Sequence, residues 1–431
     1  MTVTEPVMVE LREDNIGGKK SDDEASSLLT AGSFVPRNSM LDREGLHNGA
    51  PPMRGFLALF WITVTLYAAA SMYRLKTQHY MGISLHLWRS EYCDFEALVV
   101  MVGAVYLSTY SALAYQLLCV KGILDCRNVL ARFWSRSLLQ AGPIVMATFV
   151  AYYRNWPHLQ TGTLICFSIS MYMKMHSFLV VNQRLDEEYR LKSGRKSSSD
   201  NDRRYPNNLT MIKYTLFLWF PTLVYRVHYP RTDRIRWGYL AERTAGVLVI
   251  FGLFYIVLGH YVHPVLQQVS ERPLLDLFVD LLLPCLCSTI LLFFLVFEYL
   301  LNWAAELTRF ADRQFYSDWW NSTDMAEFAR KWNVPVHKFL QHHIYDEARR
   351  HHSPLAAKTL TFLYSSVFHE LVMSATAGKL KLWMLGMQMS QLPLMYLAQA
   401  TGLNRRPFLA NCIWWLMIIL GIPFLVLLYS R

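Results

Sequence analysis

The sequence is poor in the features that mark several common protein classes. Charged residues make up only 17% of its 431 residues, whereas hydrophobic residues make up 53%. The seven cysteines show neither the spacing of metal ligands nor that of a disulfide framework. No internal repeat is evident, which disfavours a transporter built from duplicated halves. The first 50 residues lack an apolar core, which excludes a cleaved signal peptide and predicts a disordered region over residues 1–54.

The hydrophobic residues are grouped in runs of roughly 20 residues, the length that crosses a bilayer core of about 30 Å as a helix. The chain is therefore predicted to be an all-α polytopic membrane protein. We expect a membrane domain over residues 55–431 with nine transmembrane helices, at about 55–74, 95–118, 137–155, 160–181, 244–265, 276–306, 355–376, 380–400 and 409–429.

Basic residues outnumber acidic ones, giving a net charge of +10, but they form no stripe interleaved with exposed aromatics, which argues against nucleic acid as a partner. They follow the positive-inside rule instead. Residues 182–243 contain thirteen Lys or Arg, whereas the turns after the third and fifth predicted helices contain one each, Arg154 and Arg272. The distribution predicts a cytosolic N-terminus.

Two long connections on the predicted cytosolic side differ in composition. Residues 185–205 are charged and Ser-rich, which predicts a flexible linker. Residues 214–240 and 307–354 are rich in Trp, Tyr, Phe and Arg, which is typical of segments lying at a membrane interface and roofing a cavity. Three apolar residues before Pro335 share one helical face: Met325, Phe328 and Trp332.

His369 and Glu370 fall near the middle of the predicted helix 355–376, where ionisable side chains are costly and normally face the protein interior or a water-filled cavity. Ser365 lies one turn before His369 on the same face. Two interpretations stay open on these residues alone. The histidine either forms a hydrogen bond between helices or acts as a general base toward an alcohol, because imidazole exchanges protons near neutral pH.

The segment FYSDWWNS at 315–322 follows the sixth predicted helix. Adjacent tryptophans flanked by Asp318 and Asn321 combine a rigid apolar patch with an acceptor and an amide donor. An aromatic anchor at the membrane interface explains the composition equally well. Both acceptor sequons in the chain, at Asn208 and Asn321, fall on the predicted cytosolic side and are expected to be unmodified.

Glu298, Asn302 and Glu306 recur every four residues and form one polar stripe leading toward FYSDWWNS. Such a stripe does not face lipid comfortably. It is interpreted mainly as a tie between helices, with Lys174 or His176 as candidate partners, and secondarily as a contact with substrate.

A basic cluster lies before the helix that contains His369. It predicts either membrane orientation or an electrostatic funnel for a polyanionic ligand. The histidine spacing and the lack of accompanying cysteine or carboxylate ligands argue against a metal site. Its members are Lys338, His342, His343, Arg349, Arg350, His351, His352 and Lys358.

Taken together, these motifs resemble the sterol O-acyltransferase and diacylglycerol O-acyltransferase branch of the membrane-bound O-acyltransferases. The resemblance rests on FYSDWWNS, KWNVPVHKFL and SSVFHELVMS in that order. It extends toward fungal sterol-esterifying members through KMHSF at 174–178, YPNN at 205–208, FPTLVYRVHYPRTDRIRW at 220–237 and LNWAAELTRFADRQFYSDWWN at 301–321.

The resemblance implies a horseshoe-like arrangement of nine helices in the endoplasmic reticulum membrane, often as a homodimer or homotetramer. It implies acyl-coenzyme A as co-substrate, a membrane sterol as acceptor, and neither a metal nor another cofactor. His369 would be the catalytic base and Asn321 its partner at the thioester. Residues near the acyl-coenzyme A would be Tyr316, Trp320, Lys358, Ser365 and Gln391.

Three other functions are compatible with the sequence. A diacylglycerol O-acyltransferase shares the motifs and the mechanism. A membrane transporter or channel would explain the nine helices and buried charges, but not the DWWN segment beside an intramembrane histidine. Acylation of another alcohol, such as a specialised metabolite, is the third.

Overall fold

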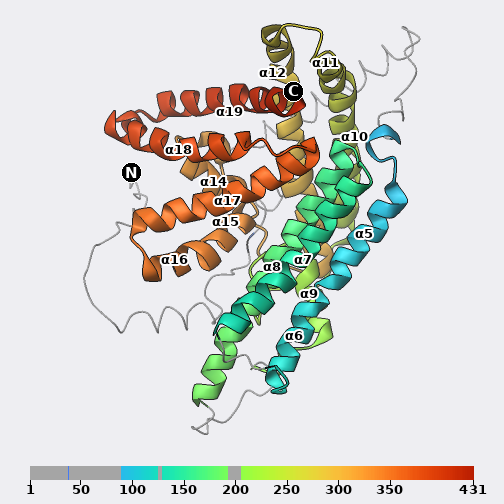
Figure 1. The fold of residues 1–431 in the computed structure, drawn as a ribbon, viewed down its shortest axis with the longest axis vertical. Coiled ribbons are helices and arrows are strands. Elements are labelled where there is room, and N and C mark those ends of the chain that lie inside the picture. Colours follow the sequence, from blue (N-terminus) through green and yellow to red (C-terminus); the bar gives the residue numbers. More distant parts are fainter. Residues whose placement is uncertain (1–36, 38–88, 125–128, 193–204) are drawn as a thin grey trace, which may run out of the picture.

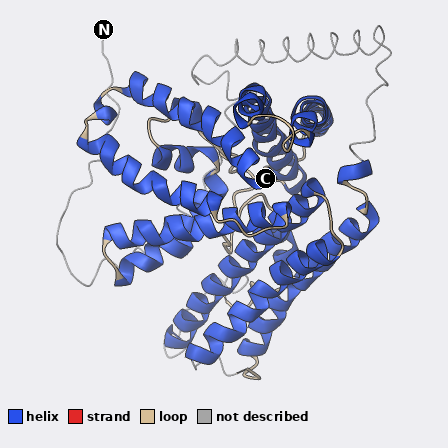
Figure 2. Ribbon diagram, turned by 45° about the horizontal axis from the view of Figure 1, so that its top comes forward, coloured by secondary structure: helices blue, strands red, loops and turns tan. Residues whose placement is uncertain are grey.

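The computed structural model describes residue 37 and residues 89–124, 129–192 and 205–431. The predicted first membrane helix, 55–74, and all of the predicted disordered region except Arg37 lie outside the described residues. Every regular element in the described ranges is a helix (Figure 2). The predicted all-α class is therefore confirmed for this part of the chain.

The N-terminal half of the described chain is a group of long helices around α8. These are α5 (Phe95–Ser108), α6 (Tyr110–Val120), α7 (Val129–Tyr153) and α8 (His158–Lys192). Helix α8 packs against α5, α6 and α7 on one side and against α17 on another (Figure 1). Because α8 is enclosed by neighbours, it can hold polar side chains that lipid would not tolerate.

Buried Lys174 of α8 illustrates this. Its Nζ donates to the carbonyl oxygens of Phe217 and Phe220, at 2.9 and 2.7 Å, where α9 (Met211–Trp219) ends. The last carbonyls of a helix have no partner within the helix, so the ammonium group caps α9.

Two long rods follow. The first consists of α10 (Trp237–Val257), the π-helical segment η2 (Leu258–Val262) and α11 (His263–Gln267); the second of α12 (Leu274–Phe293), the π-helical segment η3 (Phe294–Leu300) and α13 (Leu301–Thr308). They approach closely at Gly246, where a Cβ would lie 2.0 Å from the Tyr299 ring. Only glycine permits this packing.

Shorter elements then lead to three more long helices. They are η4 (Trp319–Asn321), α14 (Met325–Trp332), α15 (Val334–Leu340), η5 (Gln341–Tyr345), α16 (Asp346–His351), α17 (Pro354–Ala377), α18 (Trp383–Ala400), η6 (Leu403–Arg405) and α19 (Pro407–Ser430). Helices α17, α18 and α19 pack against one another, and α19 also packs against α12 (Figure 1). The predicted amphipathic helix before Pro335 is confirmed as α14, which Asp324 caps by accepting from the Glu327 amide at 2.7 Å.

Five helical rods in the described residues are long and apolar enough to cross a membrane. They are Phe95–Val120, His158–Leu191, Trp237–Gln267, Leu274–Thr308 and Pro407–Ser430. The other three predicted positions in the described ranges are helical too, as α7, α17 and α18. The polar residues of these helices include Arg132 and Arg136 in α7 and His369 and Glu370 in α17.

The predicted linker at 185–205 is wrong at its start. Helix α8 continues to Lys192, and its charged end is held by ion pairs such as Arg190 Nε to Asp186 Oδ2, at 2.9 Å. At the other end, Tyr205 is buried and accepts a hydrogen bond from Gln116. Charges spaced four apart stabilise a helix, so composition alone misjudged these residues. Residues 193–204 lie outside the described part.

Two further expectations need correction. Cys119 is disulfide-bonded, whereas the other five cysteines in the described residues are free, so one bridge exists without any framework of spacings. Arg37, in the region predicted to be disordered, forms a two-pronged ion pair with Asp312, at 2.9 and 3.0 Å. The backbone of Arg37 also forms an isolated β-bridge with Asp312, so the bidentate pair and the bridge together fix this residue.

Candidate functional site

Helix α17 begins and ends at well-defined caps. The Ser353 hydroxyl accepts from the Ala356 amide at 3.3 Å, Pro354 takes the first turn, and Gly378 ends the helix with a φ of 65°. The left-handed backbone conformation at this position favours glycine, because glycine has no Cβ. The helix that carries the proposed base is therefore fixed at both ends.

His369 has an exposed side chain near the last third of α17. Its Nδ1 lies 2.8 Å from the carbonyl oxygen of Ser365. A carbonyl oxygen can only accept, so in the neutral ring the proton sits on Nδ1 and the lone pair on Nε2. The structure thus brings together the two residues predicted to share a face, through the backbone of Ser365 and not its hydroxyl.

The neighbouring Glu370 is buried and saturated. Its carboxylate accepts from the Leu382 and Leu385 amides at 3.0 and 3.1 Å, from the Tyr429 hydroxyl at 2.7 Å, and from the Ser374 hydroxyl. These donors belong to the start of α18, the end of α19 and α17 itself. Glu370 therefore fastens three helices together, and an anion at the start of α18 also complements that helix's dipole.

Aromatic side chains join α17 to α8 directly before His369. The ring of Phe368 lies 5.4 Å from that of Tyr172 and 5.0 Å from that of Tyr364. The Tyr364 hydroxyl donates to the Tyr172 hydroxyl at 3.4 Å. This contact positions the histidine's segment of α17 against the enclosed helix α8.

The segment FYSDWWNS ends in the short 3-10 turn η4. Trp319 is buried, with its ring among those of Phe293, Trp332 and Trp414. The half-buried Trp320 accepts through its carbonyl from Asn411 of α19, at 2.9 Å. These two tryptophans pack against other parts of the protein, and a role as an anchor at the membrane interface stays a prediction.

Asn321 is placed differently from the tryptophans before it. Its side chain is exposed, and its Nδ2 lies 3.5 Å from Asp318 Oδ2, at the limit of a hydrogen bond. The turn therefore buries its aromatic residues and presents an amide donor outward.

Tyr316 is buried, and its hydroxyl donates to Glu298 Oε2 at 2.7 Å. The same carboxylate accepts from Arg243 of α10 at 2.5 Å. The family resemblance implies that Tyr316 lies near the acyl-coenzyme A, but its hydroxyl is engaged within the protein. Its visible role is to hold the FYSDWWNS segment against α12, η3 and α13.

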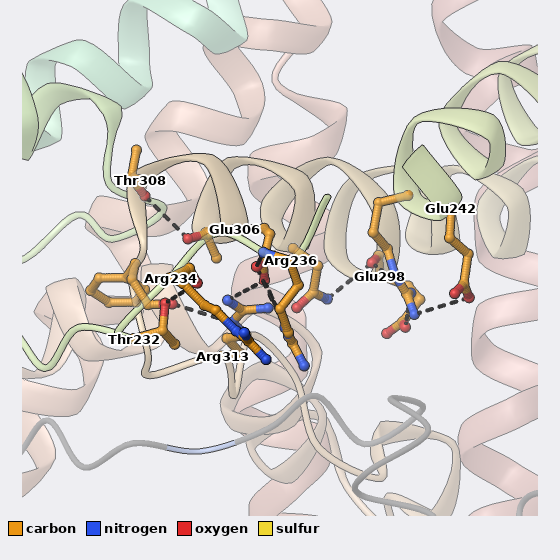
Figure 3. Close-up of polar contacts among 12 residues, drawn as sticks. Thr232, Arg234, Arg236, Glu242, Glu298, Glu306, Thr308 and Arg313 are labelled. Atoms are coloured by element: carbon orange, nitrogen blue, oxygen red, sulfur yellow. Dashed lines mark hydrogen bonds and ion pairs between the residues drawn. The ribbon is translucent and has the colours of Figure 1, made fainter. Parts of the chain in front are cut away.

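The polar stripe on η3 and α13 is confirmed as a tie between helices, but its expected partners are wrong. Glu306 pairs with Arg236 at 3.1 Å and with Arg313 at 2.6 Å (Figure 3). Asn302 donates to the carbonyl of Glu298 at 2.9 Å. Lys174 and His176 are engaged elsewhere, with the end of α9 and with Gln140.

Arg243 is a structural residue that was not predicted from the sequence. It lies seven residues into α10, with its side chain buried against Glu298. An arginine directly before an apolar run was attributed to membrane orientation. Its spacing from Arg236, seven residues or two helical turns, was the available signal that both face one neighbour.

The basic cluster divides between the interior and the surface. Burial lowers the pKa of His343 well below the usual histidine range, and its Nε2 lies 2.8 Å from the Ser177 hydroxyl. Burial also lowers the pKa of Lys338, although the ion pair with Asp312 at 3.1 Å opposes that shift. The members with exposed side chains are Arg349, Arg350, His351, His352 and Lys358.

Lys358 and Gln391 are two further residues that the resemblance places near the acyl-coenzyme A. Lys358 is exposed on α17, eleven residues before the histidine, which is about 16 Å along a helix axis. Gln391 is half-buried on α18. In the described ranges neither side chain forms a hydrogen bond with His369 or Asn321, and no cluster of potential metal ligands occurs there.

Comparison with known proteins gives a consistent result. A model of the membrane-bound O-acyltransferase family matches residues 128–431. The chain is 30% identical to probable sterol O-acyltransferase 2 of Schizosaccharomyces pombe, over 91% of this chain and 90% of that protein. It is 30% identical to sterol O-acyltransferase 2 of Saccharomyces cerevisiae, over 87% of this chain but 66% of that protein.

A relative with a different name also matches. Diacylglycerol O-acyltransferase 1 of Dictyostelium discoideum is 33% identical, over 93% of this chain and 65% of that protein. The family match covers well over half of the chain and contains both the FYSDWWNS segment and α17. The chain is therefore a member of the membrane-bound O-acyltransferase family, and as such a membrane acyltransferase.

Proposed function

We propose that this protein transfers a long-chain acyl group from acyl-coenzyme A to a membrane sterol. The family is supported by the match over residues 128–431, and the sterol by the names of the fungal relatives. The observation that carries the chemistry is the exposed His369 ring, whose Nδ1 is engaged by Ser365 so that Nε2 keeps its lone pair.

The reaction requires only this chain's residues and the two substrates. Nε2 of His369 takes the proton of the sterol hydroxyl as the hydroxyl oxygen attacks the thioester carbon. The Asn321 amide donates to the oxygen of that carbonyl as negative charge develops. The carbon–sulfur bond then breaks, the imidazolium returns its proton to the coenzyme A sulfur, and the products are a steryl ester and free coenzyme A.

The remaining candidate residues would bind acyl-coenzyme A. The exposed cation of Lys358 and those of Arg349 and Arg350 would attract its phosphates at the start of α17. Ser365, Trp320, Tyr316 and Gln391 would line its path farther along, Tyr316 through its ring, because its hydroxyl is held by Glu298.

The membrane arrangement is part of the same proposal. Nine spans in a horseshoe-like domain over residues 55–431 would place the N-terminus in the cytosol and the enzyme in the endoplasmic reticulum, as a homodimer or homotetramer. The support is the asymmetry of basic residues between loops and the five apolar rods in the described part of the chain.

A second acceptor, diacylglycerol, is favoured by one observation, the similarity to the Dictyostelium enzyme over nearly the whole chain. Purified protein incubated with labelled oleoyl-coenzyme A and either a sterol or diacylglycerol distinguishes the two. We expect labelled steryl ester. Labelled triacylglycerol alone would overturn the sterol assignment, and no ester with either acceptor would overturn both.

A further inference from the structure

A cavity of about 350 Å³ lies between α6, α7 and α8, away from α17 and FYSDWWNS. Each helix contributes one face. Tyr115 comes from α6, Arg132 and Arg136 come from successive turns of α7, and Leu179 and Gln183 come from successive turns of α8. The volume is at the lower end of the range for small-molecule sites in proteins.

The charges around this cavity do not balance. Arg132 pairs with Glu187 at 3.4 Å, and Arg190 pairs with Asp186 at 2.9 Å. The third arginine, Arg136, donates from Nη1 to the neutral amide of Gln183 and forms no ion pair within the described residues. Among the described residues that line the cavity, three arginines therefore face two carboxylates, which leaves an excess of one positive charge.

Arg136 also has a hydrogen-bond donor that is unsatisfied among the described residues. Its Nε is buried and has no hydrogen-bond partner in the described part of the chain. A buried N–H without an acceptor costs roughly 1–3 kcal/mol, so such groups are usually satisfied by a ligand or by water. An anionic oxygen in the cavity would satisfy the hydrogen bond and the charge together.

The surroundings identify the kind of anion. Next to the arginines, α7 presents an exposed apolar face, with Leu130 70%, Phe133 59%, Trp134 61% and Leu138 71% exposed. Exposed aromatic and aliphatic residues beside arginines are typical of the interface between headgroups and acyl chains. A soluble phosphate compound would use the arginine but not this apolar face.

We propose that the cavity between α6, α7 and α8 binds the phosphodiester headgroup of a membrane phospholipid, with Arg136 as its main ligand and the lipid's acyl chains along α7. The site is separate from the proposed catalytic residues. The two are linked through α8, which also carries Tyr172, and Tyr172 contacts Phe368 beside His369.

The test uses the full-length protein, purified in detergent and stripped of lipid. Short-chain phosphatidylcholine, short-chain phosphatidylserine or inorganic phosphate is then added, and binding is measured by native mass spectrometry and by the shift in Tm. We expect one tightly bound phospholipid per chain and a higher Tm. Inorganic phosphate that stabilises the protein as well as the lipids do would overturn the lipid assignment.

Variants locate the site. Arg136→Gln should weaken phospholipid binding by at least about tenfold, as expected for loss of one charge-assisted hydrogen bond. Arg405→Gln removes an exposed arginine elsewhere and should bind like the wild type. Equal phospholipid affinity in Arg136→Gln and Arg405→Gln would refute the proposal.

A second variant guards against misfolding of the first. Gln183→Glu keeps the shape of the side chain that contacts Arg136 and adds an internal carboxylate to it. Because Gln183 Nε2 also donates to Glu187 Oε1 at 2.8 Å, a modest fall in Tm is expected, yet the folded variant should bind phospholipid weakly. Undiminished binding in Gln183→Glu would also overturn the proposal.

Discussion

The tie formed by η3, α13 and α10 differs sharply from α17, although both place ionisable residues in helices within the membrane domain. In the tie, Glu298 and Glu306 are buried and matched by arginines and a tyrosine hydroxyl. On α17, His369 is exposed, with one ring nitrogen held by its own helix and the other without a partner in the described residues.

This difference in burial and hydrogen bonding separates polar residues that hold helices in place from those that can react with a substrate. A buried carboxylate whose oxygens both accept hydrogen bonds from the protein stabilises one arrangement of helices and is not placed to take a proton from a substrate. A ring with a fixed tautomer and an unengaged nitrogen can exchange a proton with a substrate. The contrast also holds between sequence neighbours, since Glu370 is saturated and His369 is not.

The largest expected effect is that of His369→Ala on turnover. Loss of a general base lowers the rate by about 10²–10⁴-fold. Steryl ester formation by purified protein measures it, with unchanged Tm as the check on folding. His260→Ala, which removes an exposed histidine from η2, is the matched control. Turnover within a few fold of the control would show that His369 is not a general base and does not differ in this respect from the buried carboxylates Glu298 and Glu306.

Asn321→Ala is expected to reduce turnover by about 10²–10³-fold, the usual cost of removing one oxyanion donor. Affinity for acyl-coenzyme A should change much less, because the amide acts on charge that develops during the reaction. Asp318→Asn, which changes the residue beside the Asn321 amide, serves as comparison. A defect confined to acyl-coenzyme A affinity would place Asn321 in binding alone.

Glu298→Ala should destabilise the fold strongly and act on activity only through folding. Removing one partner of a buried ion pair costs about 3–5 kcal/mol, because the other charge is left buried and unpaired. Here Arg243 would keep only longer contacts such as that with Glu242 at 3.6 Å, and the Tyr316 hydroxyl would lose the Glu298 carboxylate as its acceptor. The Tm of Glu242→Ala, which removes an exposed carboxylate near the same arginine, provides the reference.

Glu370→Gln should be less harmful than Glu298→Ala. The amide keeps the shape and one acceptor oxygen, but its NH₂ group faces donors, for an expected loss of about 1–3 kcal/mol. The Tm should fall, and turnover per folded molecule should stay close to that of the wild type. A selective loss of turnover at unchanged Tm would show that Glu370 serves the reaction and not the packing of α17, α18 and α19.

The smallest effect is expected for Glu347→Ala. Glu347 pairs with Arg184 and Arg350, each at 3.1 Å, but its side chain is 48% exposed. Exposed ion pairs contribute about 0–1 kcal/mol because water screens them. A Tm change as large as that of Glu298→Ala would show that burial does not separate the two kinds of pair.

Much of the architecture was predictable because its signals are local. Apolar runs located the helices at all eight predicted positions in the described ranges, and the one-faced stripe of Met325, Phe328 and Trp332 located α14. The continuation of α8 to Lys192 was missed because a charged, Ser-rich segment has the composition of a linker. The ion pairs that hold this end, to partners such as Arg132 and Glu347, join residues far apart in the sequence.

For the candidate site, the sequence indicated the candidate residues but not which of them are buried, which are exposed and which partners they contact. His369, Asn321 and the stripe of Glu298, Asn302 and Glu306 stood out because polar groups are rare in such surroundings. Burial of Tyr316 against Glu298, and burial of Lys338 and His343 out of the basic cluster, could not be seen from spacing. Which neighbour accepts a hydrogen bond depends on helices that meet only in the folded chain.

By itself the sequence determined that this protein is helical and membrane-embedded, because the length and periodicity of apolar runs fix how a chain partitions between water and lipid. Only the tertiary structure decided which polar side chains have all their hydrogen-bonding atoms engaged within the protein and which keep an atom available for a substrate. That outcome depends on contacts between distant segments, such as Arg243 with Glu298 and Tyr429 with Glu370, and each contact exists only once the helices have packed.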